Sequence, residues 1–390
     1  MSIWLYGSLA DFHGPPQFNY MFSSLKTTRD ILKFRLRMWR ALREPAPALA
    51  ASPQELDRLV SLQTAYWQAH PPLLGLAAQE FLHDLNRHSI STYVLSVRGR
   101  EVRLWDKGDV SYAGVDEVTR RHEQRSFLKR AQMYRAFVQT VLARGSLNES
   151  FDLALNVTDI PDDATELPIF GFQKLRGGHH LLLPDVDFFH SKWYRDERDA
   201  VSYEEKSISA CFVGSSTGGL LTEDGIRNGE TPRLRAAAYY HGHPQILFRI
   251  ANAVHCVSDE ARALLESQPY FGGQMGWQDQ LGHRFLMSMD GNGAACSRLV
   301  KGLLSNSVVV KFDSPYDLYY FPALRLGGDM LLATSEADVE RFVEAELECP
   351  GTFKDVAESG QRFVQKYLTI HSVMDYTERL LESYASLVRC

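Results

Sequence analysis

Apolar and polar positions follow several patterns along the chain, and each pattern predicts a type of element. The first ninety residues show mostly helical spacing of apolar positions, interrupted at residues 44–53 by the proline- and alanine-rich EPAPALAASP. Alternating and β-branched positions then predict two strands, STYVLSV and VRLW, separated by the turn-forming RGRE. Residues 126–145 return to helical periodicity and end at Gly145, a residue type that commonly terminates helices.

Short apolar segments in the rest of the chain predict strands that alternate with helices. The first half contains LALNV, LPIFGF and HHLLLP, and the second half contains ISACFVG, QILFRIA, HRFLMSM and SVVVKF. Two amphipathic helices, at roughly 352–368 and 372–388, follow. Strands that alternate with helices indicate parallel sheets covered on both faces. Because 390 residues exceed what one hydrophobic core usually serves, we expect an α/β protein with two Rossmann-like domains.

Composition narrows the class of protein further. The net charge of −6 argues against general binding of nucleic acid, which favours a basic chain. The five cysteines lie far apart without a CxxC pair, which is typical of a reducing compartment. The first residues lack the pattern of a secretion signal, and no apolar run approaches about 18 residues. We therefore expect a cytoplasmic location.

A carboxylate follows the apolar segment LALNV, in NVTDIP. Ligands of open α/β sheets bind at the carboxyl ends of strands, so Asp159 is placed to accept a proton from a substrate hydroxyl. The alternative is a turn in which Asp159 bonds its own backbone ahead of Pro161.

A second strand-end loop is rich in glycine and hydroxyl groups. The segment CFVGSSTGG, residues 211–219, can present backbone N–H groups and side-chain donors to a phosphate. It matches neither the P-loop nor the GxGxxG pattern, and turns of this composition are common. The residues of interest are Gly214, Ser215, Ser216 and Thr217.

A third strand end, MSMDGNGAACSR, stops at two glycines and restarts as a helix. The N-terminal amides of that helix attract anions, and Arg298 adds a fork of donors that suits phosphate oxygens. The alternative is a glycine-rich connection with a solvated arginine. The candidate residues are Asp290, Gly291, Asn292, Ser297 and Arg298.

Two further patterns leave alternatives open. Asp185 and Asp187 form an Asp-x-Asp pair of the kind that holds Mn²⁺ or Mg²⁺ in some sugar-nucleotide enzymes, and four histidines are conceivable ligands of another metal. These histidines are His179, His180, His241 and His243. Residues 26–43, KTTRDILKFRLRMWRALR, hold seven basic residues and one acidic residue among apolar ones. They predict either a basic helix that rests on an anionic membrane or a helix packed on the domain with its arginines in water.

Taken together, these motifs resemble glycosyltransferase family 90, which includes capsule-associated xylosyltransferases, protein O-glucosyltransferases and bacterial lipopolysaccharide-modifying enzymes. NVTDIP is similar to the family's Asn-Val-x-Asp segment, and FVGSSTGG to its Gly-Ser-x-Thr loop. HRFLMSMDGNGAACSRLVKGLLSNSVVVK is similar to its segment with Ser-x-Arg. The three motifs occur in the family's order between about Leu153 and Leu368.

The resemblance implies a GT-B architecture, with two Rossmann-like domains facing a cleft and a C-terminal helix returning to the first domain. We expect an N-terminal acceptor-side domain at residues 1–205, a UDP-sugar-binding domain at 206–370 and the returning helix at 371–390. The family inverts the anomeric centre, uses a UDP-sugar as co-substrate and works without a metal or other cofactor.

The resemblance also implies a role for each candidate. Asp159 corresponds to the general base, the 214–217 loop lies beside the diphosphate, and Arg298 neutralises the departing UDP. The 290–297 segment lies along the nucleotide. Arg233, in Thr-Pro-Arg-Leu, is a candidate for a second phosphate contact.

The expected function is therefore an inverting, metal-independent transfer of xylose or glucose from a UDP-sugar to a hydroxyl of a glycan or lipid-linked glycan. The pathway implied is lipopolysaccharide, O-antigen or capsule biosynthesis in a bacterium, at the inner face of the membrane if residues 26–43 touch it. After residues 316–320 the chain reads Leu324-Arg325-Leu326-Gly327, where animal members have a Trp-Val-His-Tyr-like stretch, and this puts the sugar contacts of that region in doubt. The alternatives are a metal-dependent transferase that uses Asp185 and Asp187, and a non-catalytic nucleotide-binding subunit of a glycan-assembly complex.

Overall fold

A computed structural model describes residues 16–107, 117–159, 166–294 and 296–389. The chain forms two compact units. One, which we call the parallel-sheet unit, contains Asp196–Pro315 and Ala323–Gln365. The other, the mixed-sheet unit, contains the described part of Leu9–Arg195 together with Tyr316–Pro322 and the chain from Lys366 onward.

The parallel-sheet unit alternates strands with helices. Its elements are β7 (Ser207–Ser215), α6 (Glu223–Asn228), α7 (Pro232–Tyr239), β8 (Ile246–Asn252), α8 (Asp259–Glu266), α9 (Trp277–Gln280), β9 (His283–Ser288), α10 (Ser297–Leu304), β10 (Val308–Phe312), β12 (Leu331–Ala333), α11 (Glu336–Glu348) and α12 (Lys354–Tyr367). A short 3₁₀ turn, Phe321–Ala323, precedes β12. The last two residues of α12 belong to the mixed-sheet unit.

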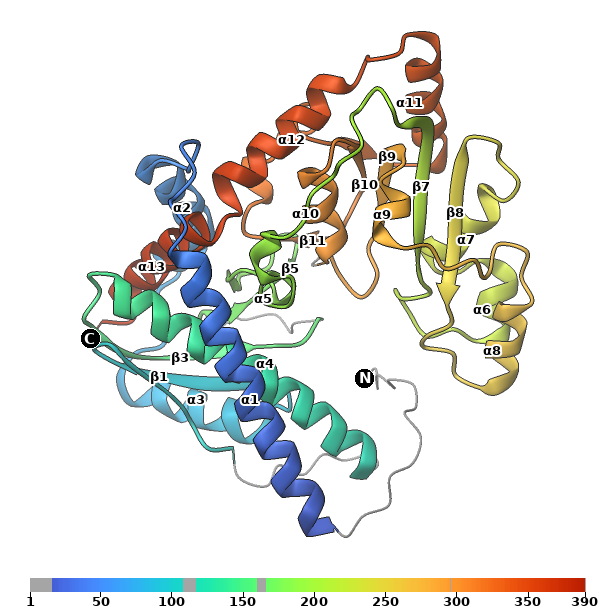
Figure 1. Ribbon diagram of the computed structural model, residues 1–390. Helices are drawn as coiled ribbons and strands as arrows, with labels where there is room; N and C mark the ends of the chain where they lie inside the picture. The colour runs from blue at the N-terminus through green and yellow to red at the C-terminus, as the bar shows by residue number, and fades with distance from the viewer. Residues whose placement is uncertain (1–15, 108–116, 160–165, 295, 390) are drawn as a thin grey trace. The chain divides into compact units, whose positions relative to one another are not determined.

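All five strands of this sheet run parallel, in the order β12-β10-β9-β7-β8 (Figure 1). The chain passes from β7 to β8 on one side, and then crosses to β9 on the other side of β7. This is the flavodoxin-like doubly wound order, and its topological switch point lies between β7 and β9. Ligands of such sheets bind at the carboxyl ends of the strands beside that point.

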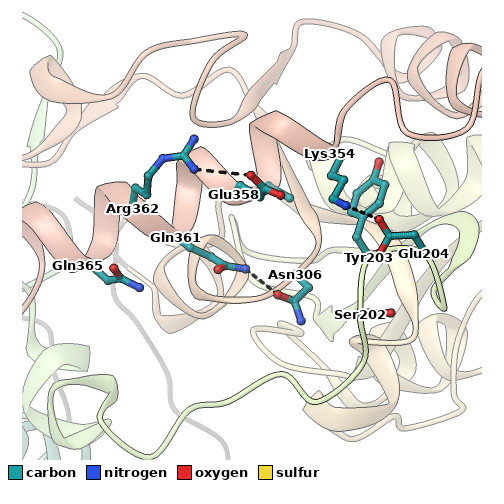
Figure 2. Close-up of a pocket in the computed structure, with 10 residues that line it drawn as sticks. Ser202, Tyr203, Glu204, Asn306, Lys354, Glu358, Gln361, Arg362 and Gln365 are labelled. Carbon is teal, nitrogen blue, oxygen red and sulfur yellow. Dashed lines mark hydrogen bonds and ion pairs between the residues drawn. The ribbon is translucent and has the colours of Figure 1, made fainter. Parts of the chain in front are cut away.

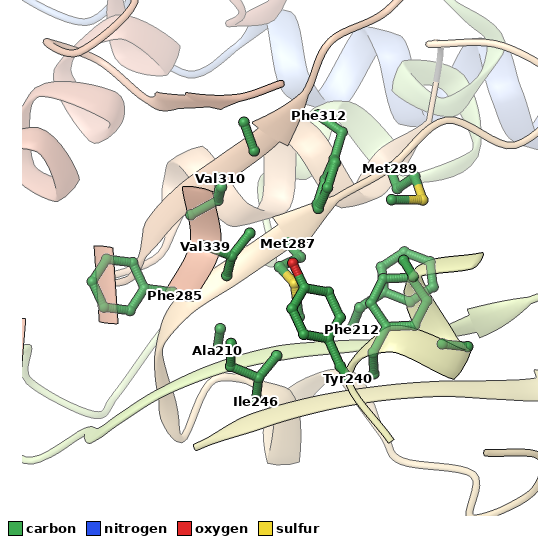
Figure 3. Packing of buried hydrophobic residues seen from close by; sticks show 14 of the residues in the cluster. Ala210, Phe212, Tyr240, Ile246, Phe285, Met287, Met289, Val310, Phe312 and Val339 are labelled. Carbon is green, nitrogen blue, oxygen red and sulfur yellow. The ribbon is translucent and has the colours of Figure 1, made fainter. Parts of the chain in front are cut away.

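The core of this unit is built from alternate residues of its strands and from the helices that cover them. Figure 3 shows Phe212 of β7, Phe285 and Met287 of β9 and Val310 of β10 gathered on one face of the sheet. Tyr240, at the end of α7, packs among them, and its hydroxyl donates to the Glu336 carbonyl at 2.7 Å. This packing fixes the strands whose ends carry the candidate loops.

The mixed-sheet unit is richer in helix. Its elements are α1 (Pro16–Leu42), α2 (Pro53–Ala69), α3 (Gly75–His88), β1 (Thr92–Arg98), β2 (Glu101–Leu104), α4 (Glu117–Arg144), β3 (Ser150–Asn156), β4 (Ile169–Gly171), β5 (Lys174–Leu175), β6 (Leu181–Leu182), α5 (Val186–His190), the 3₁₀ turn Lys192–Tyr194, β11 (Tyr316–Asp317) and α13 (Ile370–Leu387). Its main sheet has the order β2-β1-β3-β4-β6, and β5 pairs with β11.

Only half of this sheet matches the Rossmann-like expectation. β3, β4 and β6 run parallel, but β1 pairs antiparallel with both β2 and β3. The tight RGRE turn makes β1 and β2 a hairpin, and two such strands must run in opposite directions. The prediction of an α/β protein with parallel sheets is confirmed, while the first sheet is mixed rather than fully parallel.

The last helix packs on the mixed-sheet unit. α13 contacts α2 and α4, and the hydroxyls of Tyr376 and Tyr384 donate to the carbonyls of Leu182 and Asp152 at 2.8 and 2.7 Å. The end of the chain therefore belongs to the same compact unit as β3.

The length and hydropathy of a helix decide whether it can span a membrane. Within the described ranges, each helix is either too short or too polar to cross a bilayer.

Candidate active site

The loop after β7 and the loop after β9 lie in contact beside the switch point. A Cβ placed on Gly291 would lie 2.2 Å from Thr217 Oγ1 and 3.0 Å from Arg233 Nη2, so only glycine permits this approach. Gly218 has φ +116, and a Cβ placed on it would lie 3.4 Å from the Gly291 carbonyl oxygen. The sequence analysis expected the glycines to make room for a ligand, and the contact that the structure shows at Gly291 is with Thr217.

Arg233, at the start of α7, joins the two loops. Its guanidinium donates to the carbonyls of Ser215, Met289 and Asp290 at 2.8, 2.8 and 3.0 Å. It also donates to Thr217 Oγ1 at 2.6 Å. Burial lowers the pKa of Arg233 to about 10, and the nearby charge of Arg298 contributes to this shift. Four of its five N–H groups are thus committed to holding the loops.

Arg298, in the first turn of α10, makes fewer bonds within the protein. Its guanidinium donates to Gln280 Oε1 at 2.8 Å and to the Val213 carbonyl. It lies 4.6 Å from the ring centroid of Phe212 and 5.7 Å from that of Trp277. Burial lowers the pKa of Arg298 as well. Among the described residues these two bonds leave three of its five N–H groups without an acceptor.

Gly214 is required by the same arrangement. The guanidinium groups of Arg298 and Arg233 lie 4.6 and 5.2 Å from the centroid of the Phe212 ring. A Cβ on Gly214 would lie 2.9 Å from that ring, so another residue would displace the surface on which both arginines rest.

The hydroxyl groups of the β7 loop have different roles. Ser216 is buried, and its Oγ donates to the Val254 carbonyl at 2.8 Å and accepts from the Val254 N–H at 2.9 Å. Its own N–H donates to the Asn252 carbonyl. Ser216 therefore fixes the loop, while Ser215 Oγ is half-exposed and accepts from Asn252 Nδ2 at 3.3 Å.

Backbone N–H groups complete the donors of this loop. Those of Thr217, Gly218 and Gly219 donate to no acceptor within the described residues. Consecutive free N–H groups of this kind form concave sites for anions. At the other loop, α10 begins after Cys296 without a side-chain cap on its first amides.

Asp290 is neutralised by residues at the end of β10. Its Oδ1 accepts from Lys311 Nζ at 2.5 Å and its Oδ2 accepts from Ser314 Oγ. Lys311 is buried. The sequence analysis missed this lysine, although a lysine inside the apolar strand SVVVKF signals a buried partner. Asp290 is paired to Lys311, and no carboxylate of the described residues forms an ion pair with Arg233 or Arg298.

Asn292 and Ser297 lie on the same loop. The Oδ1 atom of Asn292 is buried and accepts no hydrogen bond from the described residues. Ser297 is the first residue of α10. The structure thus brings together all the candidates of the second half of the chain, namely Gly214, Ser215, Ser216, Thr217, Arg233, Asp290, Gly291, Asn292, Ser297 and Arg298.

Asp159 lies in the mixed-sheet unit, just after β3. Its Oδ1 accepts from Arg130 Nη1 at 3.0 Å, and the same nitrogen donates to the Val157 carbonyl at 2.9 Å. Gln173 Nε2 donates to the Asp159 carbonyl. The carboxylate is partly exposed, and its Oδ2 makes no hydrogen bond to another described residue. Ile160 and Pro161, the rest of the predicted turn, lie outside the described residues.

The sequence analysis missed Arg130. In α4 it precedes the buried residues Tyr134, Phe137 and Val141 at spacings of four, seven and eleven. A charged residue on an apolar stripe signals a partner near the core, which here is Asp159.

The Asp-x-Asp pair has a local structural role. Asp185 is buried and caps α5 by accepting from the Asp187 N–H at 2.8 Å. Burial and the charge of Asp187 raise the pKa of Asp185 to about 8. In the described part of the chain, no three His, Cys, Asp or Glu side chains form a group that could hold a metal.

A separate pocket of about 440 Å³ lies at the amino ends of the parallel strands, whereas the candidate loops lie at their carboxyl ends (Figure 2). Its residues include Tyr203 and Glu204, just before β7, and Asn306, just before β10. Its charged side chains form two pairs, Lys354 with Glu204 at 2.5 Å and Arg362 with Glu358 at 3.6 Å. Because these charges cancel and the pocket lies at the amino ends of the strands, we do not assign it to the nucleotide.

Three comparisons place the chain among known proteins. No curated protein matches it. One solved structure, described as the crystal structure of the GtfA/B complex, is similar at 14% identity and a TM-score of 0.31, over 48% of this chain. This chain spans 38% of the length of that solved chain.

The family model described as glycosyl transferase family 90 matches residues 151–390, which is more than half of the chain. The matched range includes both strand-end loops of the parallel-sheet unit and Asp159. The chain belongs to glycosyl transferase family 90.

Proposed function

We propose that this protein is an inverting glycosyltransferase that moves a sugar from a UDP-sugar to a hydroxyl group of a glycan acceptor without a metal ion. Xylose and glucose are the first candidates for the sugar. A glycan or lipid-linked glycan of lipopolysaccharide, O-antigen or capsule is the first candidate for the acceptor.

The observation that carries this proposal is the uncompensated positive charge at the switch point. Arg233, Arg298 and Lys311 face a single carboxylate, Asp290, which leaves a net charge of about two positive among these four groups. Free backbone N–H groups of residues 217–219 and the first turn of α10 add dipoles of the same sign. A nucleoside diphosphate has the charge and the oxygen atoms that this set of donors would accept.

The two arginines would divide the work. Arg233 donates four hydrogen bonds to the two loops and holds them in contact. Arg298 donates two within the described residues, so three of its N–H groups could donate to a ligand. As the bond between the anomeric carbon and the diphosphate oxygen breaks, UDP gains negative charge. Fixed donors aimed at a developing anion are each worth roughly 10²–10³ in rate. Arg298 is the side chain best placed to supply them in place of a metal.

Asp159 would act as the general base. As the acceptor oxygen forms its bond to the anomeric carbon, its proton passes to the carboxylate, and the electron pair of the breaking bond leaves with UDP. Oδ1 is held by Arg130, which orients the carboxylate, while Oδ2 makes no bond to another described residue. We propose that Oδ2 is the atom that accepts the proton of the acceptor hydroxyl.

A UDP-release screen over the common UDP-sugars tests the proposal. Slow hydrolysis of the correct donor is expected even without the acceptor, and UDP-xylose and UDP-glucose should be tried first. Tight UDP binding with no turnover of any UDP-sugar, across a broad panel of acceptors, would contradict it and favour a non-catalytic nucleotide-binding subunit.

The same assay decides the question of the metal. Activity should be unchanged in EDTA, because we assign the neutralisation of UDP to arginine and backbone donors. Loss of activity in EDTA that Mn²⁺ or Mg²⁺ restores would favour the metal-dependent alternative. Asp185→Asn and Asp187→Asn would then show whether that pair holds the ion.

A further inference from the structure

Helix α1 has two apolar faces, and the described residues of the chain cover only one of them. Phe34, Met38 and Ala41 are buried, and α1 packs with this face against α4, α13 and the 3₁₀ turn Lys192–Tyr194. The ring of Phe34 lies 5.1 Å from that of Phe189. The positions 34, 38 and 41 have the spacing of one helix face, as in an ordinary packed helix.

The second apolar face starts two residues earlier with the same spacing. Leu32, Leu36 and Trp39 are 60%, 46% and 50% exposed. A shift of two residues is a rotation of about 200°, so this stripe points away from the packed face. Single exposed leucines are common, but three large apolar side chains in one row on the outward face of a helix are not.

Basic side chains surround this stripe on both sides. The exposed cations of the described part of the segment are Arg29, Lys33, Arg35, Arg37, Arg40 and Arg43. Arg43 lies 3.7 Å above the ring of Trp39. None of the six forms an ion pair with a described carboxylate, and Asp30 is engaged by Lys129 at 3.0 Å. On a chain of net charge −6, these six cations, which form no ion pair within the described residues, make a local patch of opposite sign to the whole.

A neighbouring helix adds to this charge. Arg135 of α4 has its pKa lowered, first by burial and then by the charge of Arg35. Like charges are thus close together where α1 meets α4, and an anionic surface would relieve this repulsion.

We propose that the outward face of α1 binds the surface of an anionic lipid bilayer, with Leu32, Leu36 and Trp39 entering the interface and the six cations contacting the headgroups. A helix with an apolar stripe and basic flanks lies in the plane of the membrane and does not cross it. The observation is independent of the nucleotide site, and the test therefore uses no sugar donor.

The test is co-sedimentation of the full chain with two kinds of vesicle, phosphatidylcholine alone and phosphatidylcholine with one quarter phosphatidylglycerol. The wild type should bind the anionic vesicles more than tenfold more tightly, and salt should weaken this binding. Equal binding to both vesicles, or binding to neither, would overturn the proposal. Binding to soluble heparin without binding to vesicles would also overturn it and would indicate a nucleic acid or another soluble polyanion.

A matched pair of variants separates this face from general surface charge. Lys33→Gln, Arg37→Gln and Arg40→Gln together should weaken binding to anionic vesicles about 100-fold, since each cation near such a surface contributes roughly fivefold. Arg58→Gln, Arg87→Gln and Arg100→Gln remove the same charge from exposed positions outside α1 and should change binding less than twofold. Equal losses in the two triple variants would contradict the assignment to α1.

A second pair tests the apolar stripe. Leu32→Ser, Leu36→Ser and Trp39→Ser together should weaken binding more than tenfold and leave the salt dependence in place. Leu76→Ser removes a leucine of α3 that is 75% exposed and should have no effect. All the substituted side chains are exposed, so thermal melting should match the wild type.

Discussion

The balance of charge differs between two regions of the molecule. One region is the pair of loops after β7 and β9 in the parallel sheet, and the other is the end of β3, which carries Asp159. After β7 and β9, two guanidinium groups form no ion pair with a carboxylate in the described part of the chain, and Asp290 is already neutralised by Lys311. After β3, the carboxylate of Asp159 has its own arginine, Arg130, at 3.0 Å. An excess of positive charge favours an anionic ligand, whereas a paired and oriented carboxylate suits an uncharged hydroxyl.

The largest effect is expected at the paired carboxylate. Asp159→Asn should lower the rate of sugar transfer by roughly 10²–10⁴, because the amide cannot take the acceptor proton. The affinity for UDP should stay within twofold, as measured by calorimetry. Asp84→Asn removes a carboxylate that is 72% exposed in the same unit and serves as the control. Full activity of Asp159→Asn would contradict the proposal that Asp159 is the general base.

The next effect concerns the arginine that holds the loops. Arg233→Ala leaves three partly buried carbonyl groups and Thr217 Oγ1 without their donor, and we expect a loss of about 3 kcal/mol in the free energy of unfolding. Chemical denaturation of the two variants Arg233→Ala and Arg298→Ala gives the comparison. A smaller loss for Arg233→Ala than for Arg298→Ala would reverse the roles assigned to the two side chains.

Arg298→Ala should act mainly on the ligand. Losing a charge-assisted contact with the diphosphate should weaken UDP binding by roughly 10- to 100-fold, with a small change in stability. Arg298→Lys keeps the charge without the planar fork and should recover part of the affinity. If Arg298→Ala binds UDP as tightly as the wild type, the phosphate role of this residue is wrong.

The smallest effect is expected at a paired charge that belongs to none of the candidate loops. Lys366 holds the pKa of Glu55 at about 2 within the mixed-sheet unit. Because this folded pKa lies below the ordinary value of 4.5, the pair stabilises the protein above about pH 4.5, and this stabilisation is lost as pH falls toward 2. Both side chains are more than one third exposed, so Glu55→Gln should cost less than about 1 kcal/mol at pH 7. The wild type and the variant should melt alike near pH 2, and a difference in melting temperature that persists there would contradict this.

The sequence predicts the strands and their loops well because their signals are local. The apolar runs of β7, β9 and β10 and the glycines behind them can be recognised without knowing any neighbour. The direction of β1 relative to β3 cannot be predicted in this way. α4 separates β2 from β3 in the chain, so the pairing of β1 with β3 is non-local. The first sheet is mixed for that reason, and the GT-B arrangement of the two units stays a prediction.

Partners in space were harder to predict than candidate residues. Arg130, which holds Asp159, lies on a helix twenty-nine positions away, and Lys311, which neutralises Asp290, lies on the next strand. Ser216 was predicted as a phosphate donor, but its hydroxyl bonds the backbone of Val254. The sequence reveals that a residue can donate a hydrogen bond, whereas the fold decides which acceptor it reaches.

Calorimetric titration of the wild type and Arg298→Ala with UDP and with uridine tests most directly whether these loops form a diphosphate site. Uridine shares the base and ribose with UDP but lacks the phosphates, so its affinity isolates the contribution of the charged donors. We expect the wild type to bind UDP at least 100-fold more tightly than uridine, and Arg298→Ala to lose most of that difference. Equal binding of UDP and uridine by the wild type would contradict a diphosphate site at the switch point.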